Sequence, residues 1–363
     1  MTVLLLGFAV SAVLTFFIIR FERTHSHFSS DRDMSGPQKF HARPVPRVGG
    51  VGIVVGLCAA LVVLVFTRAG DSSLGLLLMG CAAPAFLAGL AEDLTKTQSP
   101  RRRLFFTVAS AAIAAWALGA IINRTDIPGV DWLVSFTVPA VVVTLVAVAG
   151  VANSVNIIDG FNGLAAMCVT MVLAALAYVA FQANDPVIAL CALAGLGAVM
   201  GFFVWNFPAG LIFLGDGGAY FLGFYMAELS VLMVVRNPDV SPLSPLLMCI
   251  YPIFETVFSM YRRKFVRGRP VGMPDGVHLH SLIYRRLMRW AVGDRTAKVL
   301  TKRNSMTAPY LWLLCMMSVV PAMLFWNNSL VLGAFIVLFA ATYTFLYASI
   351  VRFKVPSWLI VRR

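Results

Sequence analysis

Long uninterrupted runs of apolar residues are the feature that most restricts how this chain can fold. Two examples are VLLLGFAVSAVLTFFII near the start and VLGAFIVLFAATYTFLYASIV near the end. Runs of roughly 17 to 23 residues are long enough to cross about 30 Å of hydrocarbon as helices. The 363 residues are 60% hydrophobic and 12% charged, which leaves too few polar side chains to coat a soluble core. The sequence therefore predicts an all-α integral membrane protein.

The apolar runs divide the chain into eleven candidate transmembrane helices. Hydropathy over windows of helical length gives the division. The predicted spans are about residues 3–19, 48–67, 74–91, 104–122, 134–152, 163–182, 187–205, 217–235, 244–261, 308–326 and 329–351. We therefore expect one polytopic domain over residues 1–363, with residues 262–307 as a long loop.

Lysine and arginine give the predicted orientation, because the cytoplasmic loops of membrane proteins accumulate these residues. With eleven spans, one set of alternate loops holds 26 of the 29 basic residues; these loops are 20–47, 92–103, 262–307 and 352–363. We therefore expect the N-terminus outside and the C-terminus in the cytoplasm. The formal net charge of +13 follows from this topology and does not indicate nucleic-acid binding.

A polar segment, NSVNIIDGFNGLA at residues 153–165, directly follows one of the apolar runs. If the fifth span continues as a helix, Asn153, Asn156 and Asp159 recur every three residues and share one face. A polar helix end among lipid headgroups is one interpretation, but such ends usually carry Lys, Arg, Trp or Tyr. A face of Asn and Asp favours a site that hydrogen-bonds a specific ligand or holds a cation.

A second polar motif, FLGDGGAYFLG at residues 213–223, places Asp216 before two glycines at the start of the eighth span. Asp216 can be interpreted as the N-cap of this helix. A helix N-terminus with glycine backbone is also a favourable phosphate site, and a carboxylate there would repel phosphate unless a cation lay between them. Mg²⁺ binds through one or two carboxylates together with substrate phosphates. The motif therefore predicts a metal-bridged phosphate.

Two further clusters lie on the predicted cytoplasmic side. Glu92 and Asp93 end the third span, where acidic side chains face the unfavourable end of the helix dipole, so we expect them to have a use. His278 and His280 precede a basic stretch with Arg285 that is predicted to be a helix in the membrane interface. A zinc site is the alternative for the histidines, but all six cysteines fall inside apolar spans and offer no ligand near them.

Together these motifs resemble the polyprenyl-phosphate N-acetylhexosamine-1-phosphate transferases of glycosyltransferase family 4. That family includes the enzymes that start O-antigen and the phospho-N-acetylmuramoyl-pentapeptide transferase. The resemblance runs through KFHARPVPRVGG, AGLAEDLTK, NSVNIIDGFNGLA, FLGDGGAYFLG, PIFET and HLHSLIYRRL. It covers nearly the whole chain. It implies an eleven-span protein of the bacterial inner (cytoplasmic) membrane with a cytoplasmic site, to which the loop of residues 262–307 contributes.

The resemblance also implies roles for individual residues. Asp216 matches the magnesium ligand of the family, with Mn²⁺ as a possible substitute, and Phe213 matches an aromatic ring that stacks near the uracil. Glu92, Asp93 and Asp159 are the candidate catalytic carboxylates, and which of them is a base, if any, stays open. The remaining candidate substrate-binding residues are Lys39, His41, Asn153, Asn156, Asn162, His278, His280 and Arg285.

This chain departs from the family pattern at three positions. The usual Asp-Asp pair is Glu92-Asp93 here, and the aspartate of the ninth-span motif is Glu255. Ser281 follows His280 where a third histidine is common. These departures bear on the identity of the base and of the sugar more than on the type of reaction.

The implied reaction transfers an N-acetylhexosamine 1-phosphate from a UDP-sugar to undecaprenyl phosphate at the cytoplasmic membrane face and releases UMP. It would be the first membrane step of a cell-envelope polysaccharide such as O-antigen. GlcNAc, GalNAc, a 6-deoxy amino sugar and a peptide-bearing MurNAc all stay open as the sugar. The expected partners are these two substrates and membrane lipid, with no nucleic acid, and a homodimer is compatible with the family.

A membrane transporter or lipid flippase is the alternative function. Acidic residues at mid-membrane depth, in broken helices related by an internal repeat, would favour it. Only Glu228 and Glu255 fall within the predicted spans, and the sequence shows no convincing repeat. The transferase is therefore the preferred hypothesis.

Overall fold

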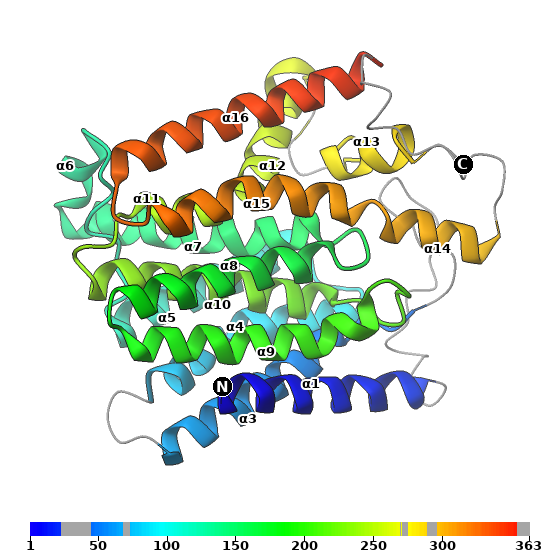
Figure 1. Ribbon diagram of the computed structural model, residues 1–363, viewed down its shortest axis with the longest axis horizontal. Coiled ribbons are helices and arrows are strands. Elements are labelled where there is room, and N and C mark those ends of the chain that lie inside the picture. Colours follow the sequence, from blue (N-terminus) through cyan, green and yellow to red (C-terminus); the bar gives the residue numbers. More distant parts are fainter. Residues whose placement is uncertain (23–44, 68–72, 269, 271–274, 289–295, 354–363) are drawn as a thin grey trace.

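The computed structural model describes residues 1–22, 45–67, 73–268, 270, 275–288 and 296–353. Helices account for nearly all the regular structure of these ranges, and they pack side by side in one bundle (Figure 1). Lys39 and His41, two of the predicted substrate-binding residues, lie outside the described residues.

The helices have the following bounds in chain order. They are α1 (Thr2–Arg20), α3 (Gly49–Thr67), α4 (Leu74–Thr95), α5 (Pro100–Leu118), α6 (Val130–Val134), α7 (Thr137–Ile158), α8 (Leu164–Gln182), α9 (Pro186–Asn206), α10 (Gly215–Arg236), α11 (Leu243–Met248), α12 (Ile250–Tyr261), α13 (Leu279–Arg286), α14 (Ala297–Ser305), α15 (Ala308–Leu324) and α16 (Ser329–Val351). A π-helical segment, Arg262–Val266, follows α12 directly.

Within the described ranges, nine helical segments are long and apolar enough to cross a membrane. This agrees with a multi-pass membrane protein, but the predicted count of eleven is not confirmed, and the orientation stays a prediction. Two predicted spans fall outside the nine. The segment predicted at 104–122 forms α5, which begins earlier and carries three arginines in its first turn. The segment predicted at 244–261 is divided into α11 and α12.

The division between α11 and α12 has a local cause. Pro252 is the third residue of α12, and proline has no N–H to bond the carbonyl four residues earlier. In the first turn of a helix that N–H has no intrahelical partner anyway, so proline fits there. The chain therefore starts a new helix at Ile250 where hydropathy alone predicts one continuous span.

Helix α10 is the centre of the bundle. Its residues from Gly215 to Val234 are all buried, and it packs against α3, α4, α7 and α8. Glycines allow the closest of these approaches: a Cβ placed on Gly89 of α4 would lie 2.6 Å from Gly217 Cα. Small residues let membrane helices pack backbone against backbone in this way. The first turn of α10 is therefore held tightly by its neighbours.

Helix α7 extends beyond the predicted apolar span. It continues through Asn153 and Asn156 to Ile158, and Asp159 is its C-cap residue. The condition under which Asn153 and Asn156 share a helix face is therefore met, although the helix runs beyond the predicted end at residue 152. The turn that follows ends at Gly163, whose φ of 74° is favourable for glycine.

The polar motifs lie together at one end of the bundle. The C-terminal ends of α4, α7 and α12 and the N-terminal ends of α3, α5 and α10 lie on the side where α13 and α14 cover the bundle, at the right of Figure 1. Residues from distant parts of the sequence meet there.

Candidate active site

The N-terminus of α10 is capped by a side chain from another helix. Asp93, in the last turn of α4, is 1% exposed, and its two carboxylate oxygens accept the backbone N–H groups of Asp216 and Gly217 at 2.9 Å each. The first N–H groups of a helix lack intrahelical partners and form the positive end of its dipole. The carboxylate that the dipole of α4 disfavours is therefore stabilised by the start of α10.

Asp216 does not act as the N-cap of α10. It is the second residue of the helix, and no side chain of α10 caps its own N-terminus. Its Oδ1 accepts a hydrogen bond from Arg47 Nη2 at 3.0 Å, and its Oδ2 forms an ion pair with the Arg103 guanidinium. The Asp216 carboxylate therefore pairs with cationic groups and not with the N–H groups of its own helix.

Backbone pairing places Arg47 beside this carboxylate. Phe213 donates its N–H to the Pro46 carbonyl at 2.8 Å, and Gly49 donates to the Phe213 carbonyl at 3.0 Å. Gly215 then has a φ of 78°, and a Cβ there would lie 2.6 Å from Asp93 Oδ2. The segment before α3 and the segment before α10 are thus fixed against each other. Phe213, predicted to stack on a base, is half-buried within this pairing.

Arg47 brings a third carboxylate into the cluster. Besides Asp216, its Nη2 lies 3.8 Å from Asp93 Oδ1. Asp159, at the end of α7, is half-buried. Burial raises the pKa of Asp159 to about 7, while the positive charge of Arg47 acts in the opposite direction. Arg47 therefore lies close to carboxylates from α4 and α10, and its charge also acts on Asp159 at the end of α7.

The polar face of α7 is connected to the same cluster. The Tyr220 hydroxyl donates to Asn153 Oδ1 at 3.4 Å, and the Arg103 guanidinium lies 6.0 Å from the centre of the Tyr220 ring. Asn156, one helical turn beyond Asn153, is half-buried. Glu92, next to Asp93 in the last turn of α4, accepts the Gln98 N–H on its Oε2 at 2.7 Å. The Glu92 side chain therefore stabilises the loop that follows α4.

Glu255 of α12 holds the two predicted histidines. It is 1% exposed. Its Oε1 lies 3.1 Å from His278 Nδ1 and accepts the Leu279 N–H at 2.9 Å. The same oxygen is 4.0 Å from His280 Nδ1. Glu255 therefore caps the N-terminus of α13 and orients the His278 imidazole, while the His280 imidazole lies beyond hydrogen-bond distance of it.

His280 lies next to the turn that follows Asp159. Its ring stands edge to face with Phe161, with centroids 5.5 Å apart, and stacks on His278 at 5.0 Å. Burial lowers the pKa of His280 to about 4, so its imidazole is neutral at neutral pH. Arg285 lies on the exposed side of α13. The histidines, which the sequence places far from Asp159, thus belong to the same end of the site.

Asn162 makes its hydrogen bonds within the protein. Its N–H donates to Asn304 Oδ1 at 2.8 Å, and its Nδ2 donates to Ser305 Oγ at 3.1 Å. These bonds attach the turn after α7 to the junction of α14 and α15. A direct substrate contact for Asn162 stays a prediction, and the structure gives this side chain a second, architectural use.

Arg47, Arg103 and Tyr220 are site residues that the sequence does not single out. Arg47 belongs to the segment KFHARPVPRVGG and Arg103 to the predicted loop 92–103, but from the sequence alone their charges count only toward topology. Arg47 and Asp216 are 169 residues apart. The available signal was an arginine two residues before the glycine pair that opens the second span.

The cluster suits a hard divalent cation bound with help from a substrate. Within the described ranges, no three His, Cys, Asp or Glu side chains converge into a complete metal site. Mg²⁺ needs no such cage, because it retains waters and takes one or two carboxylates together with phosphates. The Asp216 carboxylate, whose Oδ2 is paired with the Arg103 guanidinium, offers oxygen ligands of the kind that hard divalent cations take. The Asp216 carboxylate is therefore compatible with Mg²⁺ or Mn²⁺ as a bound cation.

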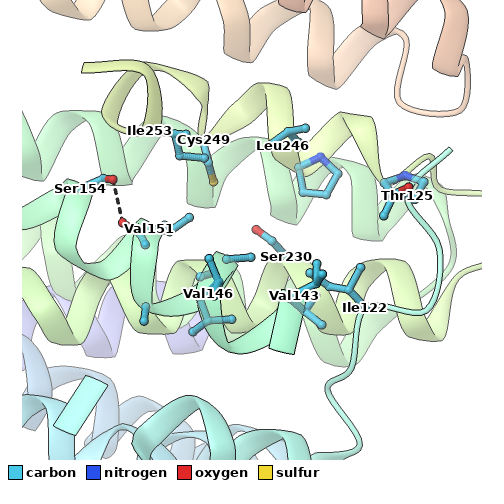
Figure 2. A pocket seen from close by; sticks show the side chains of 18 of the residues that line it. Ile122, Thr125, Val143, Val146, Val151, Ser154, Ser230, Leu246, Cys249 and Ile253 are labelled. Atoms are coloured by element: carbon cyan, nitrogen blue, oxygen red, sulfur yellow. Dashed lines mark hydrogen bonds between the residues drawn. The ribbon is translucent and has the colours of Figure 1, made fainter. Parts of the chain in front are cut away.

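An apolar cleft opens beside the polar cluster. It has a volume of about 560 Å³ and lies between α7, α10 and the α11–α12 pair. Figure 2 shows Val146 and Val151 on one side of it and Leu246, Cys249 and Ile253 on the other. Its lining continues from Ile122 and Thr125 at one end of the bundle to Asn153, Ser154 and Leu104 near the other. The cleft therefore leads from the membrane interior to the residues that adjoin Arg103 and Tyr220.

Comparison with known proteins identifies relatives of this chain. Residues 73–234 match the family model for glycosyl transferase family 4. The chain is 28% identical to the undecaprenyl-phosphate alpha-N-acetylglucosaminyl 1-phosphate transferase of Thermotoga maritima, over 77% of this chain and 81% of that protein. It is 24% identical to a probable undecaprenyl-phosphate N-acetylglucosaminyl 1-phosphate transferase of Bacillus subtilis, over 72% and 71% of the two chains.

A third relative comes from another branch of the same group. The chain is 32% identical to the phospho-N-acetylmuramoyl-pentapeptide-transferase of a Mycobacterium species, over 62% of this chain and 74% of that protein. The resemblance predicted from the motifs is thereby confirmed, because relatives from both branches align over most of their length. The chain belongs to glycosyl transferase family 4.

Proposed function

We propose that this protein transfers a sugar 1-phosphate from a nucleotide diphosphate sugar to undecaprenyl phosphate. The observation that carries the proposal is the carboxylate and arginine cluster around Asp216, together with an apolar cleft whose lining includes Leu104, next to Arg103, and Asn153, the partner of Tyr220. A cluster of this kind suits phosphate groups and a cation, and the cleft suits a hydrocarbon chain. The names of the relatives, which are transferases of phosphosugars, support the same reaction.

UDP-N-acetylglucosamine is the proposed donor, and the cytoplasmic face is the proposed site of transfer. Two of the relatives are named as N-acetylglucosaminyl 1-phosphate transferases, and most basic residues belong to the loops on the side of the site. The product would be a lipid-linked sugar diphosphate that starts a cell-envelope polysaccharide. A peptide-bearing MurNAc donor is the second candidate, since other relatives are phospho-N-acetylmuramoyl-pentapeptide transferases.

The proposed reaction is an in-line phosphoryl transfer. An oxygen of the lipid phosphate attacks the β-phosphorus of the UDP-sugar, the bond from that phosphorus to the bridging oxygen breaks, and UMP leaves. The acceptor phosphate is already largely ionised at neutral pH. Orientation and neutralisation of charge therefore contribute more than the strength of a base.

Each residue of the site has a proposed role in this reaction. Asp216 would hold Mg²⁺, which when bound neutralises charge on the diphosphate. Asn153 and Asn156 would hydrogen-bond the nucleotide sugar, and His280 would contact it from the other side of the Asp159 turn. Asp159 or Glu92 would orient or deprotonate the lipid phosphate.

Asp93 has a different assignment from the one expected from the family motif. Both of its carboxylate oxygens accept N–H groups of α10, so both are occupied by the backbone of that helix. We assign Asp93 to the positioning of Asp216.

A transfer assay tests the proposal. The purified protein in lipid nanodiscs is incubated with undecaprenyl phosphate, Mg²⁺ and one radiolabelled donor, which is UDP-GlcNAc, UDP-GalNAc or UDP-MurNAc-pentapeptide. We expect UDP-GlcNAc to give a chloroform-soluble product and UMP, and millimolar UMP to reverse the reaction, because one phosphoanhydride replaces another. Absence of lipid-linked product with all three donors would contradict the proposal.

A further inference from the structure

Arg47 occupies the position around Asp216 where a cation would bind. Its guanidinium donates to Asp216 Oδ1 at 3.0 Å and lies 3.8 Å from Asp93 Oδ1. The side chain is about a quarter exposed, so it has room to move toward the mouth of the site. Its backbone, by contrast, is fixed by the pairing of Pro46 and Gly49 with Phe213. The structure thus combines a fixed attachment point with a side chain that can reorient.

A metal ion and both arginines cannot all contact Asp216 as they stand. Arg47 lies on Oδ1 and Arg103 on Oδ2, so each oxygen already has a positive partner. A divalent cation bound to this carboxylate would repel the nearby guanidinium groups in a partly buried site, where charge interactions are stronger than in water. A phosphate group arriving with the cation would attract the same guanidinium groups, which bind phosphate oxygens in forked pairs.

We infer that Arg47 neutralises Asp216 in the free enzyme and moves onto the phosphates of the donor when metal and nucleotide bind, so that the two bind together and not one after the other. The inference rests on the proposed function and adds a binding order and a phosphate-binding residue to it. It requires that metal alone binds weakly, because metal alone must displace Arg47 without offering it a new partner. It also requires strong mutual enhancement between metal and a nucleoside diphosphate, which is reciprocal by linkage.

Binding of Mn²⁺ followed by electron paramagnetic resonance tests this without any turnover. The full-length protein is titrated with Mn²⁺ alone and with Mn²⁺ in the presence of saturating UDP. For the wild type we expect UDP to tighten Mn²⁺ binding at least about tenfold. Arg47→Gln should bind Mn²⁺ alone about tenfold more tightly than the wild type, and the enhancement by UDP should fall to about twofold or less.

Two further variants separate the effect of charge from a general loosening of the site. Arg47→Lys retains the positive charge, so its affinity for Mn²⁺ alone should stay within about twofold of the wild type. Arg101→Ala removes a charge from an exposed position in the first turn of α5 and should behave as the wild type. Thermal unfolding of each variant in the same nanodiscs shows that it is folded.

The possible results point to different conclusions. Unchanged Mn²⁺ affinity in Arg47→Gln, equal tightening in Arg47→Lys, or full retention of the UDP effect in Arg47→Gln would each overturn the inference while leaving the proposed function intact. A wild-type protein that binds neither Mn²⁺ nor UDP would overturn the proposed function, and the inference with it.

Discussion

Asp93 and Asp216 have identical side chains, but their surroundings give them different tasks. Asp93 accepts two backbone N–H groups and so stabilises the first turn of α10. Asp216, carried by that same turn, has only guanidinium groups as partners among the described residues. The sequence predicts both residues as functional from their positions at helix ends. It could not predict which one is the cap, because that depends on a contact 123 residues apart.

We expect Asp216→Asn to abolish most of the transfer activity without unfolding the protein. The amide has the same shape but no charge, so it cannot neutralise a cation. Loss of one electrostatic contact to the reacting group costs about 10²- to 10³-fold in rate, and we expect a loss of at least this size. Membrane abundance and Mg²⁺-dependent transfer are measured together for the variant.

The matched control for this variant is Asp239→Asn. Asp239 is exposed beyond the C-terminal end of α10, far along the helix from Asp216, so its replacement should leave both quantities unchanged. Near wild-type transfer in Asp216→Asn would remove this residue from the mechanism.

At the scale of elements, the site depends on how closely α3, α4 and α10 approach. Gly89 lies four residues before Asp93 on the same face of α4, and a Cβ there would lie 2.6 Å from both Gly217 Cα and Gly217 N. Backbone atoms cannot move aside as a flexible side chain can. The cap of α10 and the position of Asp216 are therefore tied to the absence of a side chain at Gly89.

Gly89→Ala tests this close approach. The added methyl group should push α4 away from α10, and misplacement of catalytic groups by about 1 Å can cost about 10²-fold in rate. We expect a lower unfolding temperature and a loss of transfer of that order. Kinetics and thermal unfolding of the purified variant give the two quantities.

Helix α4 supplies its own control for this substitution. A Cβ on Gly80 would meet nothing within 4 Å, and alanine is favoured over glycine in helices by about 0.5–1 kcal/mol. Gly80→Ala should therefore be slightly stabilised and fully active. Equal effects of the two substitutions would mean that helix propensity, and not the contact with α10, determines the result.

Sequence patterns predicted the helices better than their contacts. Apolar run length indicates where a helix can cross a membrane, but it placed the end of the fifth span at residue 152, whereas α7 continues to Ile158. Hydropathy averages over a window, so it did not detect the break before Ile250 that Pro252 accommodates. It also carries no information about partners, and therefore Glu255 appears in the sequence only as a departure from a motif, without its contacts to His278 and Leu279.

At the scale of the whole molecule, the apolar cleft gives the polar cluster a route to the membrane interior. The cleft runs along α7 and α10 and faces α11 and α12 across a gap that Figure 2 shows lined by Val143, Val146, Leu246 and Ile253. Apolar side chains on all sides suit the hydrocarbon part of a lipid and exclude a nucleotide. The two proposed substrates would therefore reach the cluster from different sides, the acceptor through the cleft and the donor from the water.

Partial filling of the cleft should separate the two substrates kinetically. Val231 of α10 lines the cleft and is 7% exposed, so Val231→Trp should obstruct a long lipid chain. Overfilling a packed site costs about 1–3 kcal/mol, which corresponds to about a 5- to 150-fold rise in the KM for undecaprenyl phosphate. The KM for the UDP-sugar, and the rate with a two-unit prenyl phosphate whose chain is too short to reach Val231, should stay unchanged.

Val337→Trp on α16, at a position 69% exposed, is the control for a bulky residue on an apolar surface. If Val231→Trp impairs the short and the long acceptor equally, the cleft does not hold the acceptor chain, and the lipid must approach the Asp216 cluster by another route.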